Sequence, residues 1–312
     1  MNALRFTLRP LSAFGTPLAG DTLFGHLCWA LAMRHGQDSL ESLLNGYTEG
    51  DPFAVLSDAF PAGLLPRPLL PSAVSGSQVS ARERKALRRL QWLPAKQYKL
   101  PLAEWLQSAC AGPVGRPSVS TQNTINRLTG TTGTGPFAPR QVEQIVFPAD
   151  TLLEVYALHD PARLSEADLQ QALDDIGQGG FGRDASAGLG KFDIVDRAAS
   201  PIDTSQACRH VMTLAPCAPA VDELDAGNCF FQPVTRFGRH GNVAALGSGG
   251  GPFKRPVLMA RTAAMLTYMG LTAATHHGCG LGGVLHPLSG VIPATVHQGY
   301  APLIPLNLEV FG

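Results

Sequence analysis

The most unusual segment of this chain is GQGGFGRDASAGLGKF, residues 177–192, which holds six glycines. Glycine at this density loses much conformational entropy on folding, so it marks backbone that needs positive φ or that another group approaches closely. The segment follows a helical pattern of apolar residues and leads into LGKFDIV, which alternates like a strand. We therefore predict a helix, a glycine-rich loop and a strand in succession.

The helix before the glycine-rich loop carries signals at both ends. Ser165 is a natural N-cap residue, with Asp168 three positions later. Apolar residues then recur at helical spacing from Leu169 to Ile176, and Gly177 follows them. Because glycine is common just beyond the last helical turn, we predict that this helix ends at Gly177.

The glycine-rich loop does not fit two common phosphate-binding motifs. A P-loop requires glycine five residues before Gly190 and Ser or Thr after Lys191, but Ala185 and Phe192 stand there. A dinucleotide-binding fingerprint requires a strand before the glycines and a helix after them, which is the reverse of the predicted order. Both motifs are therefore excluded.

A nucleophile elbow is excluded as well, because it requires glycine two residues before Ser186, where Asp184 stands. Two interpretations of the glycine-rich loop remain open. One is a plain turn. The other is a loop that wraps a nucleic-acid backbone with its amides and with Arg183, Ser186 and Lys191.

The overall charge limits how this chain could bind nucleic acid. It carries 24 basic and 24 acidic side chains, so binding to nucleic acid or to a membrane must use local patches. Only 15% of its residues are charged, which hints at large contacts with neighbouring molecules. One basic stretch, residues 81–99, predicts either a solvated helix face or a surface for RNA or an acidic partner.

The cysteines and histidines indicate neither a disulfide framework nor a metal site. The six cysteines show no C-x-x-C spacing, and the nine histidines show no H-E-x-x-H pattern. The first residues, MNALRFTLRP, have no signal-peptide core, and no run of eighteen apolar residues occurs. We expect a soluble, cytoplasmic protein without a metal or cofactor.

The first part of the chain predicts a strand and a helix, followed by irregular segments. Residues 3–9 alternate like a strand, and a helical apolar stripe follows, with Asp21 or Thr22 as its cap. Residues 61–80 and 110–139 are rich in proline, glycine or small polar residues, so we predict irregular excursions there.

Strand patterns resume further along the chain. Residues 141–158 predict a pair of strands, and after residue 200 CRHVMTLAP and NCFFQPVTRFG predict two more. RPVLMARTAAMLTYM predicts a strand or a helix. We predict two α+β units in tandem, residues 1–200 and 201–312.

Seven segments, spread over nearly the whole chain, match one known family in the same order. They are PLSAFGTPLAGDTLFGHLCWALA, LLPRPLLP, NTINRLTGTTGTGPFAPRQVEQIVF, GGFGRDASAGLGKFDI, TRFG, GPFKRPVLM and VHQGYA. Together they resemble the RAMP superfamily (repeat-associated mysterious proteins), most closely the cap subunit of type III-A CRISPR effector complexes. Relatives in type III-D or type VII complexes remain open as alternatives.

The resemblance implies a fold and a function. The fold would be a tandem of ferredoxin-like units related to RNA-recognition modules, with irregular insertions and a glycine-rich loop. The function would be non-catalytic: in antiviral defence, the subunit would grip the 5′ repeat-derived handle of the guide RNA (crRNA) and cap the filament of backbone RAMP subunits. It would also dock a large signalling subunit or a nuclease subunit, and it would meet target RNA only indirectly.

The resemblance also implies which residues contact the RNA. One side of the RNA would face Gly182, Arg183, Ser186, Gly188, Gly190 and Lys191. The other side would face the loop before the first helix, with Thr16, Asp21 and Thr22. Further candidates in matching segments are Asn123, Arg127, Thr129, Arg236, Lys254 and Arg255. Bare main chain at the glycines would let amides and guanidinium groups approach the phosphates.

Two alternatives to an RNA-binding scaffold stay open. A metal-independent endoribonuclease that matures the guide RNA would need a base and a cation at the scissile phosphate, and His26 and Lys191 are the candidates. A packed, hydrogen-bonded His26 is the simpler explanation of that residue. The other alternative is a module that binds only proteins through its weakly charged surface.

Overall fold

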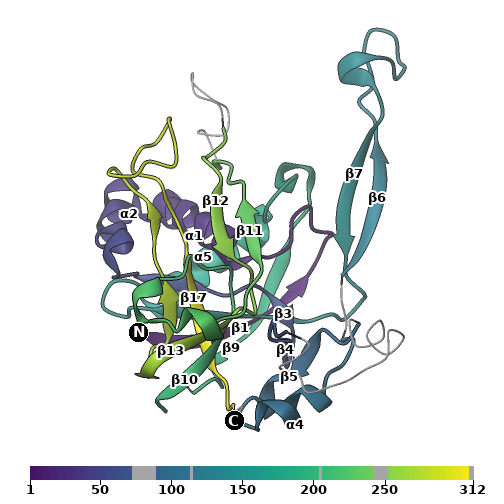
Figure 1. The fold of residues 1–312 in the computed structure, drawn as a ribbon. Helices are drawn as coiled ribbons and strands as arrows, with labels where there is room; N and C mark the ends of the chain where they lie inside the picture. The colour runs from purple at the N-terminus through teal and green to yellow at the C-terminus, as the bar shows by residue number, and fades with distance from the viewer. Residues whose placement is uncertain (72–88, 113–114, 204–205, 242–251, 309–312) are drawn as a thin grey trace.

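Two adjacent antiparallel sheets, one from each half of the chain, form the centre of the molecule (Figure 1). The structure is a computed structural model, and it describes residues 1–71, 89–112, 115–203, 206–241 and 252–308. Within these residues, every α-helix lies before residue 180. The mixture of helices with antiparallel strands confirms the predicted α+β class.

The first half folds around a sheet with the strand order of a ferredoxin-like unit. Six elements build it in the order βαββαβ: β1 (Asn2–Pro10), α1 (Gly20–His35), β2 (Ala54–Leu56), β8 (Leu153–His159), α5 (Glu166–Gly179) and β9 (Phe192–Ala199). The order across the sheet is β2-β8-β1-β9, and all neighbours are antiparallel. The ferredoxin-like fold implied by the resemblance is therefore present in this half.

The core of this half lies between its sheet and its two long helices. On β1, Leu4, Phe6 and Leu8 are buried, as the alternating pattern predicted. They share one hydrophobic cluster with α1 and α5, for example with Phe24 and Leu173. Each such buried side chain stabilises the fold by about 1.5 to 3 kcal/mol, so this cluster holds the loops at its edge in place.

The glycine-rich loop begins where α5 ends. The predicted N-cap of α5 is confirmed, because Ser165 accepts a hydrogen bond from the Asp168 amide. The predicted end at Gly177 is wrong: the helix runs to Gly179, and Gly180 follows as the C-cap with φ 95°. Gly177 lies inside the helix, where a Cβ atom would collide with the Phe192 carbonyl of β9. The glycine at this position therefore allows α5 to pack closely against β9.

The predicted side-chain cap of α1 is also wrong. The N-cap residue is Ala19, which has no side chain able to cap, while Asp21 and Thr22 lie within the first turn. The amide of Gly20 instead donates to the Asp58 carboxylate, 38 residues away, at 2.7 Å. A tertiary contact thus replaces the local one.

A long insertion connects β2 to β8. Its elements are β3 (Phe60–Pro61), β4 (Leu64–Pro66), β5 (Trp92–Pro94), α4 (Leu102–Gln107), β6 (Arg116–Gln122) and β7 (Arg140–Val146). The hairpin of β6 and β7 projects from the body of the molecule (Figure 1). Most of the predicted basic helix, including Arg84, lies outside the described residues, and its remaining part forms β5 and a 3-10 turn.

Two predictions for the insertion are corrected. The segment 110–139 is not irregular throughout, because residues 116–122 form β6. Its sequence, RPSVSTQ, is polar and mostly exposed, so no apolar alternation marked it as a strand. The strands within 141–158 exist but do not pair with each other: β7 pairs with β6, and β8 pairs with β1 and β2.

The second half contains a four-stranded antiparallel sheet and two short ribbons. The strands of the sheet are β10 (Cys208–Thr213), β13 (Met265–Thr272), β14 (His276–Gly278) and β17 (Tyr300–Pro305), in the order β13-β10-β17-β14. The ribbons pair β11 (Pro233–Arg236) with β12 (Val257–Ala260), and β15 (Leu281–Gly282) with β16 (Val296–His297). RPVLMARTAAMLTYM thus forms two strands rather than a helix.

The two halves are joined by hydrogen bonds along the edge at β2. The Gln298 side chain donates to the Leu56 carbonyl and accepts from the Leu56 amide, at 2.8 and 2.9 Å. The Tyr300 hydroxyl donates to the carbonyl of Tyr47, which lies between α2 (Gln37–Leu44) and β2. Because these contacts are buried, the halves share one interior.

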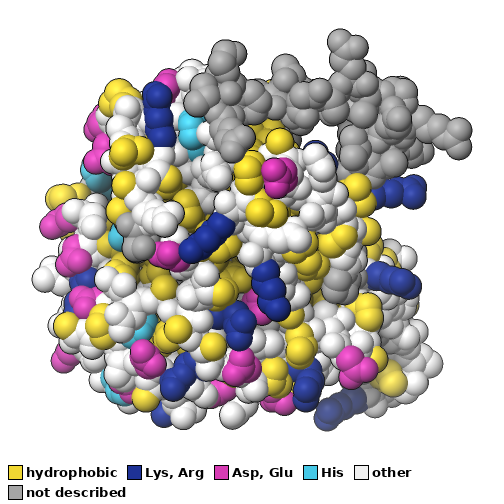
Figure 2. All heavy atoms as spheres, turned by 90° about the horizontal axis from the view of Figure 1, so that it is seen from below, with side chains coloured by type: hydrophobic (Ala, Val, Ile, Leu, Met, Phe, Trp, Pro, Cys, Tyr) yellow, Lys and Arg dark blue, Asp and Glu magenta, His cyan; other side chains and the backbone are white. Residues whose placement is uncertain are grey.

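The face seen from below in Figure 2 has no continuous basic surface. Lysine and arginine side chains lie apart from one another, among acidic, hydrophobic and uncharged ones.

All six cysteines are free thiols. Over the described ranges, no helix is long and apolar enough to cross a bilayer, and His, Cys, Asp and Glu side chains form no cluster of three suited to a metal ion.

Candidate nucleic-acid interface

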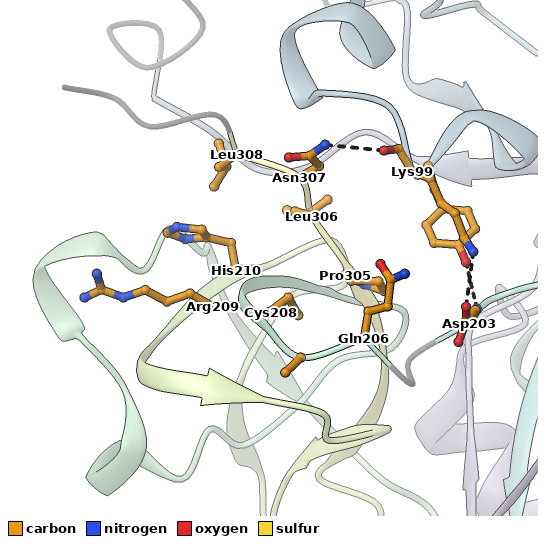
Figure 3. Close-up of a pocket in the computed structure, with 12 residues that line it drawn as sticks. Lys99, Asp203, Gln206, Cys208, Arg209, His210, Pro305, Leu306, Asn307 and Leu308 are labelled. Carbon is orange, nitrogen blue, oxygen red and sulfur yellow. Dashed lines mark hydrogen bonds and ion pairs between the residues drawn. The ribbon is translucent and has the colours of Figure 1, made fainter.

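An open pocket of about 440 Å³ lies beside the C-terminal end of β17 (Figure 3). Two of the cations that line it are already paired within the protein. Lys99 Nζ lies 3.1 Å from Asp203, and Arg209 Nη2 lies 3.3 Å from Asp225. The pocket therefore does not combine the groups predicted to bind RNA, and the glycine-rich loop is the stronger candidate.

The glycine-rich loop folds back on itself and adopts left-handed backbone at several positions. The Phe181 amide donates to the Gly190 carbonyl at 2.9 Å, which closes the loop. Gly182 and Gly190 both have φ 75°, a value that costs other residues energy. A Cβ atom at Gly190 would also collide with the Phe181 carbonyl. These glycines are thus needed by the loop's own fold.

The loop amides bind the neighbouring segment of the same chain. Gly190 N donates to the Ala13 carbonyl at 2.7 Å, and Lys191 N donates to Ser12 Oγ at 2.9 Å. Arg183 N donates to Thr16 Oγ1 at 3.0 Å. These amides are therefore not available for phosphates in this conformation, and Thr16 supports the loop instead of facing it from across a groove.

What the glycine-rich loop presents to solvent is a small group of polar side chains. Ser186 and Lys191 are exposed, and in the described part of the chain neither side chain has a hydrogen-bond or ion-pair partner. The Arg183 side chain is half exposed; its guanidinium donates to the Glu143 carbonyl of β7, and its Nε lies 3.5 Å from the Asp184 carboxylate, which is itself partly exposed. At Gly188 a Cβ atom would meet open space. The loop can thus offer two cations and a hydroxyl to an anion.

His26 of α1 anchors the same loop. Its Nε2 accepts a hydrogen bond from the Gly182 amide at 3.1 Å, and its ring packs on Phe181 with centroids 4.9 Å apart. Burial lowers the pKa of His26 from 6.5 to about 4, so its ring is neutral near pH 7. The nitrogen lone pair that a general base would use is already engaged by the loop, as expected for a packed histidine.

The candidates on the hairpin lie far from the loop. Asn123, Arg127 and Thr129 are exposed in the connection between β6 and β7, at the distal end of the projection (Figure 1). The base of the hairpin lies beside the loop, since Phe14 and Ile145 form a backbone bridge there. The structure thus keeps the hairpin candidates apart from the loop that carries Arg183 and Lys191.

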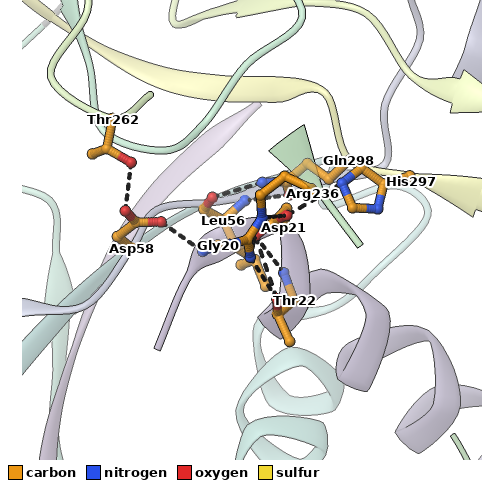
Figure 4. A network of polar contacts seen from close by, with 9 residues as sticks. All are labelled: Gly20, Asp21, Thr22, Leu56, Asp58, Arg236, Thr262, His297 and Gln298. Atoms are coloured by element: carbon orange, nitrogen blue, oxygen red, sulfur yellow. Dashed lines mark hydrogen bonds and ion pairs between the residues drawn. The ribbon is translucent and has the colours of Figure 1, made fainter. Parts of the chain in front are cut away.

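Three further candidates belong to a polar network that joins the two halves (Figure 4). Arg236 of β11 forms a two-point ion pair with Asp21, at 2.6 and 2.7 Å, and also donates to Thr22 Oγ1 at 2.9 Å. His297 Nε2 lies 3.2 Å from the same carboxylate. The Asp21 side chain is 1% exposed, so it lies in the interior rather than at a surface for RNA.

The charge state of Asp21 follows from these neighbours. Burial by itself would raise the pKa of Asp21, but His297 and Arg236 outweigh burial and lower the pKa from 3.8 to about 2. The carboxylate is therefore ionised at all ordinary pH values. Its negative charge depends on Arg236 for compensation.

The N-terminus of α1 is occupied by a carboxylate from the chain itself. Asp58 accepts hydrogen bonds from the Gly20 amide and from the Thr262 hydroxyl. A helix N-terminus attracts anions through its free amides and its dipole, and here Asp58 supplies the anion. The Gly20 amide, in the segment expected to form the second side of an RNA site, thus already has a partner within the chain.

Asp58 makes the stability of the chain depend on pH. Burial raises its pKa from 3.8 to about 6, so between these values the folded state keeps a proton that the unfolded state loses. Its contribution to the free energy of unfolding therefore falls as pH rises from about 4 to about 6. Asp58→Asn cannot lose this proton, and it keeps an acceptor for the Gly20 amide.

We expect Asp58→Asn to gain stability relative to the wild type on going from pH 4 to pH 7.5, by on the order of 1 to 3 kcal/mol. Urea unfolding of both proteins at the two pH values measures this difference. Asp222→Asn, at an exposed position, is the control. Its free energy of unfolding should change between the two pH values by the same amount as that of the wild type. Parallel curves for Asp58→Asn would show that Asp58 does not titrate in this window.

Lys254 and Arg255 point in different directions. Lys254 lies against α1, and burial lowers the pKa of its ammonium group, which the Cys28 side chain partly offsets. Arg255 is exposed. Only Arg255 of this pair is free to contact a large ligand.

Comparison with known proteins places this fold in a known class. No family model matches the sequence, and no curated protein matches it. The fold, a ferredoxin-like unit with a glycine-rich loop after its second long helix followed by a second antiparallel unit, is similar to that of solved Csm4 chains, which confirms the predicted resemblance at the level of fold.

The similar solved structures contain Csm4 of type III-A CRISPR-Cas complexes. A chain of the Csm1-Csm4 cassette in complex with pppApA is 17% identical, with a TM-score of 0.62 and coverage of 100% of both chains. The cassette in complex with cA3 gives 17% identity, a TM-score of 0.59, and coverage of 99% of this chain and 100% of that chain. A chain of the Csm3-Csm4 subcomplex is 14% identical, with a TM-score of 0.57 and coverage of 98% of this chain and 100% of that chain.

Proposed function

We propose that this chain is an RNA-binding subunit of a type III-like CRISPR effector complex and that it grips the 5′ repeat-derived handle of crRNA. The observation that carries the proposal is the likeness to Csm4 chains over the whole length of both proteins. A match of this extent includes the insertion, the loop and both sheets, so it is more than a shared ferredoxin-like core.

The grip is formed by side chains on a preorganised loop. Lys191 and Arg183 supply positive charge, and Ser186 supplies a hydroxyl that can donate to a phosphate oxygen. The loop does not need to rearrange, because His26 and Thr16 already hold its backbone. A local pair of cations is what a chain with zero net charge requires for binding an anionic strand.

The neighbours in the complex would be a large signalling or nuclease subunit and the backbone RAMP subunits. The similar structures are a Csm1-Csm4 cassette and a Csm3-Csm4 subcomplex, which supports both kinds of contact. The hairpin of β6 and β7 offers exposed apolar side chains for such contacts, including Ile125 and Leu128. In this arrangement the chain caps the filament and meets target RNA only through its neighbours.

We assign catalysis to other subunits, because Nε2 of His26, the candidate general base, already accepts a hydrogen bond from the Gly182 amide. We expect the purified chain to bind repeat RNA of its own CRISPR array in EDTA and to leave it intact. A gel shift and a denaturing gel of the same samples measure binding and cleavage. Specific cleavage that His26→Ala abolishes would establish the endoribonuclease instead. Absence of binding, alone and within the reconstituted complex, would refute the proposed grip.

A further inference from the structure

A second surface with nucleic-acid chemistry lies on the extension of the β11-β12 ribbon. Beyond these strands the chain continues to pair, with a backbone bridge between Arg239 and Phe253. Phe237 is 76% exposed and Phe253 is 69% exposed, and Arg239 and Arg255 are exposed beside them. We call these four residues the ribbon face.

The residues that alternate with those of the ribbon face are less exposed than they are. The intervening residues point the other way: His240 is buried and hydrogen-bonded to Ser289 at 2.7 Å, and Lys254 lies against α1. Hydrogen bonds hold the two segments in register, for example from Lys254 N to the Gly238 carbonyl at 2.9 Å. Because successive side chains of paired strands point to opposite faces, the phenylalanines and arginines must share the outer one.

The composition of the ribbon face matches single-stranded nucleic acid. Exposed aromatic rings offer platforms on which bases stack, and arginines beside them pair with phosphates. The face holds two phenylalanines and two arginines and no acidic residue. A protein partner that covered only the two rings would leave both guanidinium groups without counter-charge, so an anionic strand with flat apolar bases is the better complement.

The helix α1 contacts both the glycine-rich loop and the segment that follows Arg239 and His240 of the ribbon. His26 holds the loop, and Trp29, one helical turn further on, packs against the ribbon: a Cβ atom at Gly241 would lie 3.2 Å from its ring. Side chains three residues apart lie on the same side of a helix, about 5 Å apart along its axis. The part of α1 that contacts the glycine-rich loop is therefore next to the part that contacts the segment at Gly241.

We propose that the ribbon face, Phe237, Arg239, Phe253 and Arg255, binds single-stranded RNA by stacking bases on its two rings. This inference rests on the proposed function, because it takes RNA as the ligand. It assigns different parts of the RNA to the two surfaces: the glycine-rich loop binds phosphates, and the ribbon face binds bases.

Fluorescence anisotropy with labelled octauridylate and with its abasic counterpart tests the proposal on the full-length chain. We expect Phe237→Ala/Phe253→Ala to bind octauridylate about ten- to hundredfold more weakly than the wild type. Its salt dependence should stay unchanged, because no charge is removed. For the abasic strand, the variant and the wild type should bind equally. Phe237→Trp/Phe253→Trp should restore binding, since it keeps flat rings.

The controls separate this proposal from the proposed function. Phe231→Ala, which removes an exposed ring elsewhere, should bind octauridylate like the wild type. One outcome is that the double alanine variant binds octauridylate as tightly as the wild type while Arg183→Ala/Lys191→Ala binds it more weakly. That result would refute RNA binding by the ribbon face and support RNA binding by the glycine-rich loop. If the variant keeps RNA binding but loses a copurifying subunit, the ribbon face is a protein interface and the proposal is overturned. If the wild type binds no RNA, both proposals fail.

Discussion

Replacing Arg236 with alanine is expected to destabilise the folded chain by about 3 to 5 kcal/mol, because it leaves the buried Asp21 carboxylate without its partner. The carboxylate is 1% exposed and receives two hydrogen bonds from the guanidinium group. His297, at 3.2 Å, is the one other charged or chargeable group paired with it in the described residues. The loss should appear in urea unfolding at pH 8, followed by circular dichroism.

The pH dependence of this loss distinguishes an unpaired charge from a simple cavity. Without Arg236, burial should raise the pKa of Asp21, so protonation would relieve part of the cost as pH falls. The destabilisation should therefore be smaller at pH 5 than at pH 8. Asp21→Asn/Arg236→Met removes both charges and should cost less than Arg236→Ala. A loss that is equal at both pH values would contradict the electrostatic explanation.

A matched control comes from the ion pair at the pocket of Figure 3. Arg209 lies 3.3 Å from Asp225, with the Arg209 side chain 49% exposed. Exposed pairs of this kind contribute about 0 to 1 kcal/mol. Arg209→Ala should therefore change stability far less than Arg236→Ala, although both remove one guanidinium group.

The second large effect is expected on RNA binding: Arg183→Ala/Lys191→Ala should weaken binding of handle RNA about ten- to hundredfold at physiological salt. Each lost phosphate contact lowers the slope of log K against log salt by about 0.7 for single strands, so two lost contacts lower it by about 1.4. Anisotropy titrations at several salt concentrations measure both quantities. Neither substitution disturbs the core, because both side chains are at the surface.

The control for RNA binding must remove equal charge elsewhere. Lys99→Ala/Arg209→Ala does so at the pocket, away from the loop. It should leave the slope for handle RNA nearly unchanged. An equal fall in slope for both double variants would mean that the loop holds no special contact, and the glycine-rich segment would then be a plain turn.

Features that depend on a few neighbouring residues were predictable from the sequence. The alternation at Leu4, Phe6 and Leu8 placed β1 correctly, and Ser165 with Asp168 placed the start of α5 correctly. The ordered set of family segments led to the fold that the comparisons support. In each case the physical signal, a periodicity or a cap, is contained in one short stretch.

Features that depend on distant partners were not predictable in the same way. Strands β7 and β8 are neighbours in sequence but pair in different sheets. The glycines at 182 and 190 suggested room for a phosphate, whereas the structure uses them for contacts with Thr16 and Phe181. The ribbon face went unnoticed because its two segments lie on either side of residues 242–251, although the alternation of Phe and Arg in TRFGRH and PFKR marks it.

Local patterns were enough to predict β1, the start of α5, the lack of common catalytic and phosphate-binding motifs, and the resemblance that led to the fold. The roles of individual polar residues became visible in the folded chain. Asp21 and Arg236 are 215 positions apart and looked like surface residues for RNA, but folding buries Asp21 and pairs it with Arg236. The physical reason is that a charged group's role is set by its burial and by the charges around it, and both come from parts of the chain that local patterns do not connect.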